Sequence, residues 1–149
     1  MNKPLSKRVG NQVRILHYEK ELKSLVRQQL DRVEPGLVEA DGGREREVAS
    51  GRIDITARDR YGNLVVIELK AGPCPTGALE QVLAYSHDLE GETGRPCRAV
   101  LMAADFSPRL EAAAKRARDV FLVRYALSEM AFPGSHITRT LWRGADEAG

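Results

Sequence analysis

Two short segments rich in β-branched residues, separated by a tight turn, constrain the fold of this chain of 149 residues more than any other feature. Residues 51–59 (GRIDITARD) and 63–70 (NLVVIELK) have the composition of strands, and residues 60–62 (RYG) connect them. A three-residue connection ending in glycine suits a type I turn completed by a left-handed residue, with Asp59 hydrogen-bonding the turn. The sequence therefore predicts a β-hairpin with one defined register.

The register of this hairpin decides which side chains share a face of the sheet. If Asp59 pairs with Asn63, Asp54 lies directly opposite Glu68, and both carboxylates point to the same side. Strand alternation places Lys70 on that side as well, whereas Val65, Ile67 and Leu69 point to the other side. The hairpin thus predicts two acids and one lysine gathered on one face.

Two carboxylates that face each other across a β-ladder repel, and a cation between them relieves the repulsion. Oxygen ligands of this kind suit Mg²⁺ or Mn²⁺, which retain waters and accept phosphate oxygens as further ligands. Lys70 would then orient or deprotonate a water and offset charge in a phosphoryl-type transition state. The alternative is a surface hairpin with a solvated polar face, in which Lys70 pairs with one of the acids.

An amphipathic helix is predicted for residues 18–33, because its apolar residues recur at helical spacing and residues 34–36 (EPG) end the pattern. On a helical wheel Glu19 lies near the buried direction, whereas Glu21 lies far from it. Since burying an unpaired acid is costly, Glu19 is a candidate third carboxylate of the metal site. The alternative is a partly solvated glutamate near a helix N-terminus.

A second helix is predicted for residues 76–90, and it carries two further candidates. Gln81 and Tyr85 are four residues apart and therefore neighbours on one flank, beside the apolar stripe of the helix. They could contact a phosphate or the attacking water. Glutamine and tyrosine are also common at the margin of a core, and this alternative stays open.

The remaining chain predicts an α/β domain with a central mixed sheet flanked by helices. Residues 98–103 have the pattern of a buried strand, Ser107 and Pro108 suit the start of a helix, and residues 120–125 suit another strand. The order of helix, two strands, helix, strand, helix and strand places helices on both faces of the sheet. We expect a basic arm (1–17), one domain (18–130) and a C-terminal extension (131–149) whose segment HITRTLW suits an edge strand.

Charge points to a nucleic-acid partner only through its distribution, because 23 basic and 21 acidic residues leave a net charge of +2. The first 14 residues contain basic side chains and no acid, as expected of an arm that follows phosphates. Candidate contacts to a nucleic-acid backbone are Lys3, Lys7 and Arg8 in this arm and Arg44, Arg46 and Arg52 around the first strand. The alternative for both groups is a solvated charged surface.

Other features exclude several classes of protein. No apolar run approaches the roughly 18 residues that cross a bilayer, and the N-terminus lacks the apolar core of a signal peptide. Cys74 and Cys97 have neither metal-site spacing nor the pattern of a disulfide framework. We therefore expect a soluble, cytoplasmic protein without a membrane partner and with two reduced thiols.

Taken together, the segments above resemble the motifs of the PD-(D/E)XK nuclease superfamily, and within it the C-terminal catalytic domain of the NucS, or EndoMS, mismatch-specific endonucleases. The resemblance covers about residues 18–128. The motifs that carry it are Glu19, 51–54 (GRID), 65–70 (VVIELK) and 81–85 (QVLAY), with 34–37 (EPGL), Arg46, Glu47, 59–63 (DRYGN) and 99–104 (AVLMAA) following the same layout.

The resemblance implies a restriction-endonuclease-like core and metal-dependent hydrolysis of DNA phosphodiesters with Mg²⁺ or Mn²⁺. Position by position it implies Asp54 and Glu68 as metal ligands, Lys70 as the catalytic lysine, Glu19 as the helix acid, and Gln81 and Tyr85 as supporting residues. It further implies a function in DNA repair or processing.

Members of that family also have an N-terminal domain that dimerises and helps to bind DNA, whereas here residues 1–17 precede the first predicted helix. Mismatch specificity is therefore not implied. A homodimer making paired cuts, a targeting partner protein, and a place in a mobile-element or defence system are all compatible with the resemblance. Two other functions stay open: a Holliday-junction-resolvase-like, structure-selective nuclease, and a non-catalytic nucleic-acid-binding module of the same fold.

Overall fold

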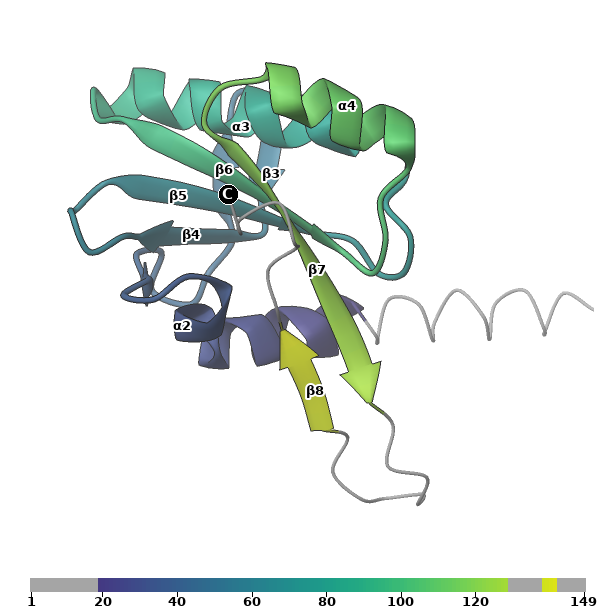
Figure 1. Cartoon of the computed structure of the whole chain (residues 1–149). Helices are drawn as coiled ribbons and strands as arrows, with labels where there is room; N and C mark the ends of the chain where they lie inside the picture. The colour runs from purple at the N-terminus through teal and green to yellow at the C-terminus, as the bar shows by residue number, and fades with distance from the viewer. Residues whose placement is uncertain (1–18, 129–137, 142–149) are drawn as a thin grey trace, which may run out of the picture.

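The computed structural model describes residues 19–128 and 138–141, and a six-stranded mixed sheet forms its centre (Figure 1). The third, fourth and fifth strands across the sheet run parallel to one another, and all other neighbouring strands of the sheet are antiparallel. Across the sheet the order is β1 (Val38–Glu39), β4 (Ile55–Arg58), β5 (Leu64–Leu69), β6 (Cys97–Ala103), β7 (Val120–Ser128) and β8 (Thr138–Leu141).

Helices cover both faces of this sheet, which confirms the predicted α/β architecture (Figure 1). The helical residues 19–28 and the short α2 (Leu30–Val33) lie on one face, and α3 (Ala78–Thr93) and α4 (Pro108–Arg116) lie on the other. Strand alternation supplies both cores, because neighbouring residues of β5 point to opposite layers. Val65 and Ile67 pack with the first helix, whereas Val66 packs with α3.

The hairpin has the predicted turn and register. Ile55 pairs with Ile67 and Arg58 pairs with Leu64. In the turn, the carboxylate of Asp59 accepts hydrogen bonds of 2.9 Å from the backbone N–H groups of Tyr61 and Asn63. Gly62 has a φ of 84°, the left-handed conformation that this type of turn requires.

The single strand predicted for residues 51–59 is wrong, because Asp54 divides it into two strands. β3 (Gly51–Ile53) leaves the main sheet and pairs with β2 (Arg46–Val48), whereas β4 begins at Ile55. At the break, the Asp54 side chain accepts a hydrogen bond of 2.9 Å from the backbone N–H of Leu69. A side-chain oxygen thus takes the place of a main-chain ladder partner.

The other predicted elements are present with small shifts in their bounds. α3 begins at Ala78 rather than at residue 76 and ends at the left-handed Gly94. Ser107 caps α4 by accepting a hydrogen bond from the N–H of Leu110. β7 extends to Ser128, and β8 adds the edge strand expected in the C-terminal segment.

Both cysteines are free, as predicted. Within residues 19–128 and 138–141 there is no helix of the length and apolarity needed to cross a bilayer. The whole predicted basic arm (1–17) and all of the predicted C-terminal extension except residues 138–141 lie outside the described residues.

Candidate active site

Two buried carboxylates meet where β3 separates from the main sheet. Asp54 occupies the break between β3 and β4, and Glu68 lies next to the end of the central strand β5. Their residues are 8% and 4% exposed. The hairpin register therefore brings the two predicted acids together, although Asp54 reaches Glu68 from a strand break and not from a continuous ladder.

The surroundings of the two carboxylates shift their pKa values in opposite directions. Burial, followed by the hydrogen bond and negative charge of Asp54, raises the pKa of Glu68 to about 9. Burial alone would raise the pKa of Asp54, but hydrogen bonds from Glu68, from the Leu69 N–H and from Lys23 together lower it. At neutral pH without a metal ion the pair thus holds one proton, mainly on Glu68.

The oxygen atoms of this pair fit a hard divalent cation. Oε2 of Glu68 is buried and has no hydrogen-bond partner among the described residues, so it is an acceptor without a donor. Within the described part of the chain no third histidine, cysteine, aspartate or glutamate completes a metal-binding cluster. One or two carboxylates completed by waters and substrate phosphate are the usual ligands of Mg²⁺, so two acids suffice.

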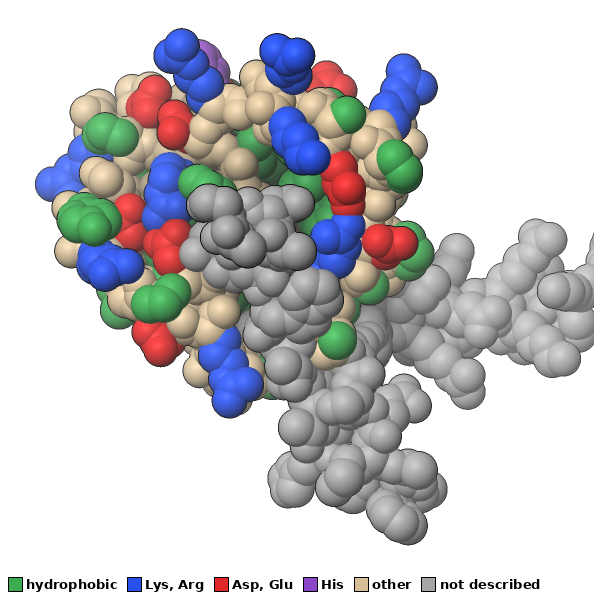
Figure 2. Space-filling model, in the orientation of Figure 1, with side chains coloured by type: hydrophobic (Ala, Val, Ile, Leu, Met, Phe, Trp, Pro, Cys, Tyr) green, Lys and Arg blue, Asp and Glu red, His purple; other side chains and the backbone are tan. Residues whose placement is uncertain are grey.

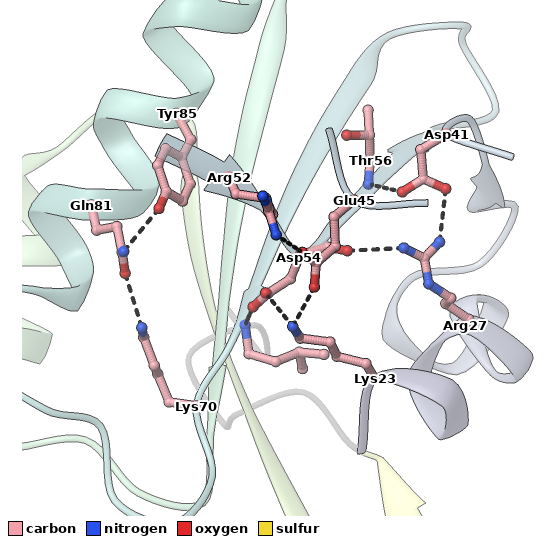
Figure 3. A network of polar contacts seen from close by, with 11 residues as sticks. Lys23, Arg27, Asp41, Glu45, Arg52, Asp54, Thr56, Lys70, Gln81 and Tyr85 are labelled. Carbon is pink, nitrogen blue, oxygen red and sulfur yellow. Dashed lines mark hydrogen bonds and ion pairs between the residues drawn. The ribbon is translucent and has the colours of Figure 1, made fainter. Parts of the chain in front are cut away.

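Lys70 lies two residues after Glu68 in the sequence, and its side chain begins a series of hydrogen bonds that leads to α3 (Figure 3). Its Nζ donates to Oε1 of Gln81 at 2.9 Å, and Nε2 of Gln81 donates to the hydroxyl of Tyr85 at 2.8 Å. The hydroxyl of Tyr125 in turn donates to the carbonyl oxygen of Lys70 at 2.7 Å. The side chain and the backbone of Lys70 are therefore both held in place.

The glycine of the GRID motif is explained by its contact with this chain. A Cβ atom at Gly51 would lie 2.8 Å from the Tyr85 hydroxyl oxygen and 2.9 Å from an atom of its ring. Tyr85 is 4% exposed, and its side chain packs in the core between the sheet and α3, so it has little room to move. Gly51 thus allows β3 to pass close to Tyr85.

Replacing Gly51 by alanine is therefore expected to destabilise the fold by about 1–3 kcal/mol, since the added methyl group overpacks the contact with Tyr85. Chemical unfolding measures this loss. The matched control is Gly91→Ala, because Gly91 lies within α3 with open space around its Cα, and alanine there should stabilise by roughly 0.5–1 kcal/mol. Equal stability of the two variants would contradict the role of Gly51.

Lys23 is a contact of the acid pair that the sequence analysis did not single out. Its Nζ lies 2.9 Å from Oδ1 of Asp54 and 2.7 Å from Oε1 of Glu45 (Figure 3). The sequence contains one signal for it, because Glu19, Lys23 and Arg27 are four residues apart and share one flank of the helix. Which of the three reaches Asp54 depends on the packing of the helix against the sheet.

Arg27 braces the strand break from the next turn of the same helix. Its guanidinium donates to the carbonyl oxygen of Asp54 at 2.9 Å and to Asp41 at 2.7 Å. The other oxygen of Asp41 accepts the backbone N–H of Thr56 at 2.9 Å. The backbone on both sides of the Asp54 side chain is thereby held by one partly buried ion pair, Arg27 with Asp41.

Glu19 and the predicted arginines do not contact the two carboxylates of the site in the described part of the chain. Glu19 is half-buried one turn before Lys23, and no hydrogen bond or ion pair among the described residues joins it to Asp54 or Glu68. Arg46 lies 3.5 Å from Glu92. The side chain of Arg52 is 61% exposed.

Arg52 forms ion pairs with Glu47 at 2.9 Å and with Glu45 at 3.5 Å, and Arg44 is exposed in the preceding loop. Figure 2 shows basic and acidic side chains interspersed over the described part of the face in view, in line with the small net charge. Lys3, Lys7 and Arg8 lie outside the described residues.

Comparison with known proteins agrees with this architecture. Residues 18–121 match the family model described as the endonuclease NucS C-terminal domain. Endonuclease NucS of Thermococcus kodakarensis is 34% identical over 98 residues, which are 66% of this chain and 36% of the relative. Endonuclease NucS of Pyrococcus horikoshii is 36% identical over 73 residues, 49% of this chain and 27% of that protein. The chain thus spans about a third of the length of these relatives or less.

Solved structures show the same fold. A structure titled as a repair endonuclease from Pyrococcus abyssi superposes with a TM-score of 0.64 at 24% identity, over 71% of this chain and 46% of the other. A structure titled as an EndoMS complex with double-stranded DNA superposes with a TM-score of 0.63 at 26% identity, over 71% of this chain and 44% of the other. With the family model matching most of its length, the chain belongs to the family of the endonuclease NucS C-terminal domain, a branch of the PD-(D/E)XK nucleases.

Proposed function

We propose that this chain is a Mg²⁺- or Mn²⁺-dependent endonuclease that hydrolyses phosphodiester bonds of DNA. The observation that carries the proposal is the buried pair of Asp54 and Glu68, with one carboxylate oxygen lacking a donor, next to a lysine held by its own hydrogen-bonded chain. Two comparisons support DNA as the substrate. The chain belongs to the NucS C-terminal domain family, and one structural relative is described as a complex with double-stranded DNA.

In the proposed mechanism Asp54 and Glu68 would hold the divalent ion, and Glu19 would add a third carboxylate only if the first helix moved, because among the described residues it forms no cluster with the pair. When bound, the ion supplies Lewis-acid stabilisation of the charge that develops on the phosphate. To hold the ion through both oxygens, Glu68 would give up its proton to solvent water. The Leu69 N–H keeps Asp54 oriented during this change, because it donates to the other carboxylate oxygen.

Lys70 acts on the attacking water and on the phosphate. One N–H of its ammonium group is used by Gln81, which leaves two for the water and a phosphate oxygen. Gln81 cannot rotate its amide freely, because its Nε2 donates to Tyr85. The hydrogen-bonded chain from Tyr85 to Lys70 therefore holds the ammonium group where it can orient the water that attacks the phosphate in line.

The charged surface and the partners belong to the same proposal. Arg44, Arg46 and Arg52 are proposed contacts to the DNA backbone near the strand break, and Lys3, Lys7 and Arg8 are proposed contacts of the N-terminal arm. To contact phosphates, Arg46 and Arg52 would give up their ion pairs with the neighbouring glutamates. A homodimer, a targeting partner, a cytoplasmic location and a function in DNA repair or processing complete the proposal.

The test is cleavage of a panel of labelled nucleic acids with Mg²⁺, Mn²⁺ or EDTA. The panel contains single-stranded and duplex DNA, mismatched duplex, a flap, a four-way junction and an RNA duplex. We expect metal-dependent cutting of DNA that is lost in Glu68→Gln, the control for contaminating nucleases. Preference for the four-way junction would identify a junction resolvase. Binding to DNA without cutting by any metal-loaded sample would contradict the enzyme and favour a binding module.

A further inference from the structure

Lys23 places a positive charge directly on a carboxylate of the candidate metal site. Its ammonium nitrogen lies 2.9 Å from Oδ1 of Asp54, and its side chain is 28% exposed. Oδ2 of Asp54 already accepts the N–H of Leu69. Both carboxylate oxygens of Asp54 therefore have donors, so a cation that binds Asp54 has to share or displace the contact with Lys23.

The electrostatic effect of this contact on a divalent ion is unfavourable. A single positive charge a few ångströms from a divalent ion repels it twice as strongly as it repels another single charge. Near a protein surface such repulsion changes a dissociation constant by about tenfold or more. Lys23 thus neutralises part of the acid pair in the metal-free protein and opposes the ion that would replace it.

Glu45 provides a second position for the same ammonium group. Its Oε1 lies 2.7 Å from Nζ of Lys23, closer than Asp54, and its side chain is 34% exposed. The other oxygen of Glu45 lies 3.5 Å from Arg52. Lys23 bonds both acids (Figure 3), so it can leave Asp54 and keep its bond to Glu45, whose side chain is more exposed than that of Asp54.

We propose that Lys23 competes with the divalent ion for Asp54, and that Glu45 retains the ammonium group when the ion binds. This inference rests on the proposed metal-dependent function and adds a determinant of metal affinity from the first helix. Lys23 and Glu45 have opposite effects in it: Lys23 weakens metal binding, and Glu45 strengthens metal binding by drawing Lys23 away. Their substitutions therefore have opposite signs.

The test is calorimetric titration of Mn²⁺ into the metal-free protein, without DNA. Lys23→Met should lower the dissociation constant by about tenfold, because it removes the competing charge and keeps an apolar stem of similar length. Glu45→Gln should raise it by a few-fold, since Lys23 then stays on Asp54. The matched control is Lys20→Met, which removes the same charge from an exposed position on the same helix and should leave the affinity unchanged.

Thermal unfolding supplies a readout that does not depend on the calorimetry. In EDTA, Lys23→Met should melt below the wild type, because Asp54 loses its ion pair. The increase in melting temperature on adding Mn²⁺ should nevertheless be larger in this variant than in the wild type. A purely structural role of Lys23 would lower both melting temperatures by the same amount and would overturn the inference.

The two levels of the proposal fail in different ways. If wild type binds Mn²⁺ but Lys23→Met binds it equally or more weakly, the competition is wrong and the metal site stands. If neither protein binds Mn²⁺, the metal-dependent function is wrong, and the inference falls with it.

Discussion

Glu68→Gln is expected to abolish metal-dependent cleavage and to make the metal-free protein more stable than the wild type. The glutamine has nearly the shape of the glutamate and is neutral at every pH, whereas the buried Glu68 has to take up a proton when the protein folds at neutral pH. The gain should be about 1–3 kcal/mol near neutral pH. The measurement is chemical unfolding in EDTA, with cleavage assayed in Mn²⁺.

The gain in stability depends on pH with a defined sign. The pKa of Glu68 rises from its ordinary value of 4.5 to about 9 in the folded protein, so folding favours the protonated acid. The wild type therefore has the full contribution of this group below pH 4.5 and loses it as the pH rises towards 9. Glu68→Gln has no such loss, and the difference in stability between the variant and the wild type should widen from pH 5 to pH 9.

Asp54→Asn is the matched control for this prediction. Its carboxylate has a lowered pKa and accepts hydrogen bonds from Leu69 and Lys23, so its contribution is present above the ordinary pKa and lost in acid. The amide should abolish cleavage too, but it should lower the stability at neutral pH by about 1–3 kcal/mol. A loss of stability in EDTA on Glu68→Gln would contradict the electrostatic account of the pair.

Lys70→Met is expected to reduce kcat by about 10²–10⁴-fold without weakening the affinity for Mn²⁺. The reason is that the ammonium group of Lys70 donates to Gln81 and, among the described residues, donates no bond to Asp54 or Glu68. Single-turnover cleavage at saturating Mn²⁺ measures the rate, and calorimetry measures the affinity. Removal of its ammonium group takes a positive charge away, so Mn²⁺ binding stays or tightens.

Two variants test the assignment of this effect to Lys70. Lys115→Met removes a lysine from the exposed part of α4 and should leave both quantities unchanged. Gln81→Met leaves the ammonium of Lys70 present but untethered, and should lower kcat by a smaller factor than Lys70→Met. Recovery of the full rate in Lys70→Met at high Mn²⁺ would show that the lysine acts on metal binding and not on the chemical step.

Local signals in the sequence were sufficient for the hairpin and for most element bounds. The turn at residues 60–62 contains its own determinants, a left-handed glycine and an aspartate that caps the turn, so the register follows without knowledge of the rest of the chain. The cap at Ser107 is local in the same way. These hydrogen bonds join a side chain to backbone N–H groups two to four residues away, so their geometry is set locally.

The break at Asp54 has a different origin. β3 turns away because Arg27 holds the Asp54 carbonyl, Leu69 donates to its side chain, and Asp41 holds the N–H of Thr56. Each partner comes from another part of the chain. Strand propensity at residues 51–59 contains no trace of these bonds, and it therefore predicts one continuous strand.

The sequence by itself determined the fold class, the hairpin register and the pairing of Asp54 with Glu68, because periodicity and turn chemistry are local. Tertiary packing alone decided that Lys23 rather than Glu19 contacts Asp54, since the position of the helix along its own axis selects which residue of this flank lies beside the acid. The need for glycine at position 51 also comes from tertiary packing, because Tyr85 is distant in the sequence and reaches Gly51 only in the folded chain. Contacts between distant segments depend on how the layers pack, and no sequence period encodes that packing.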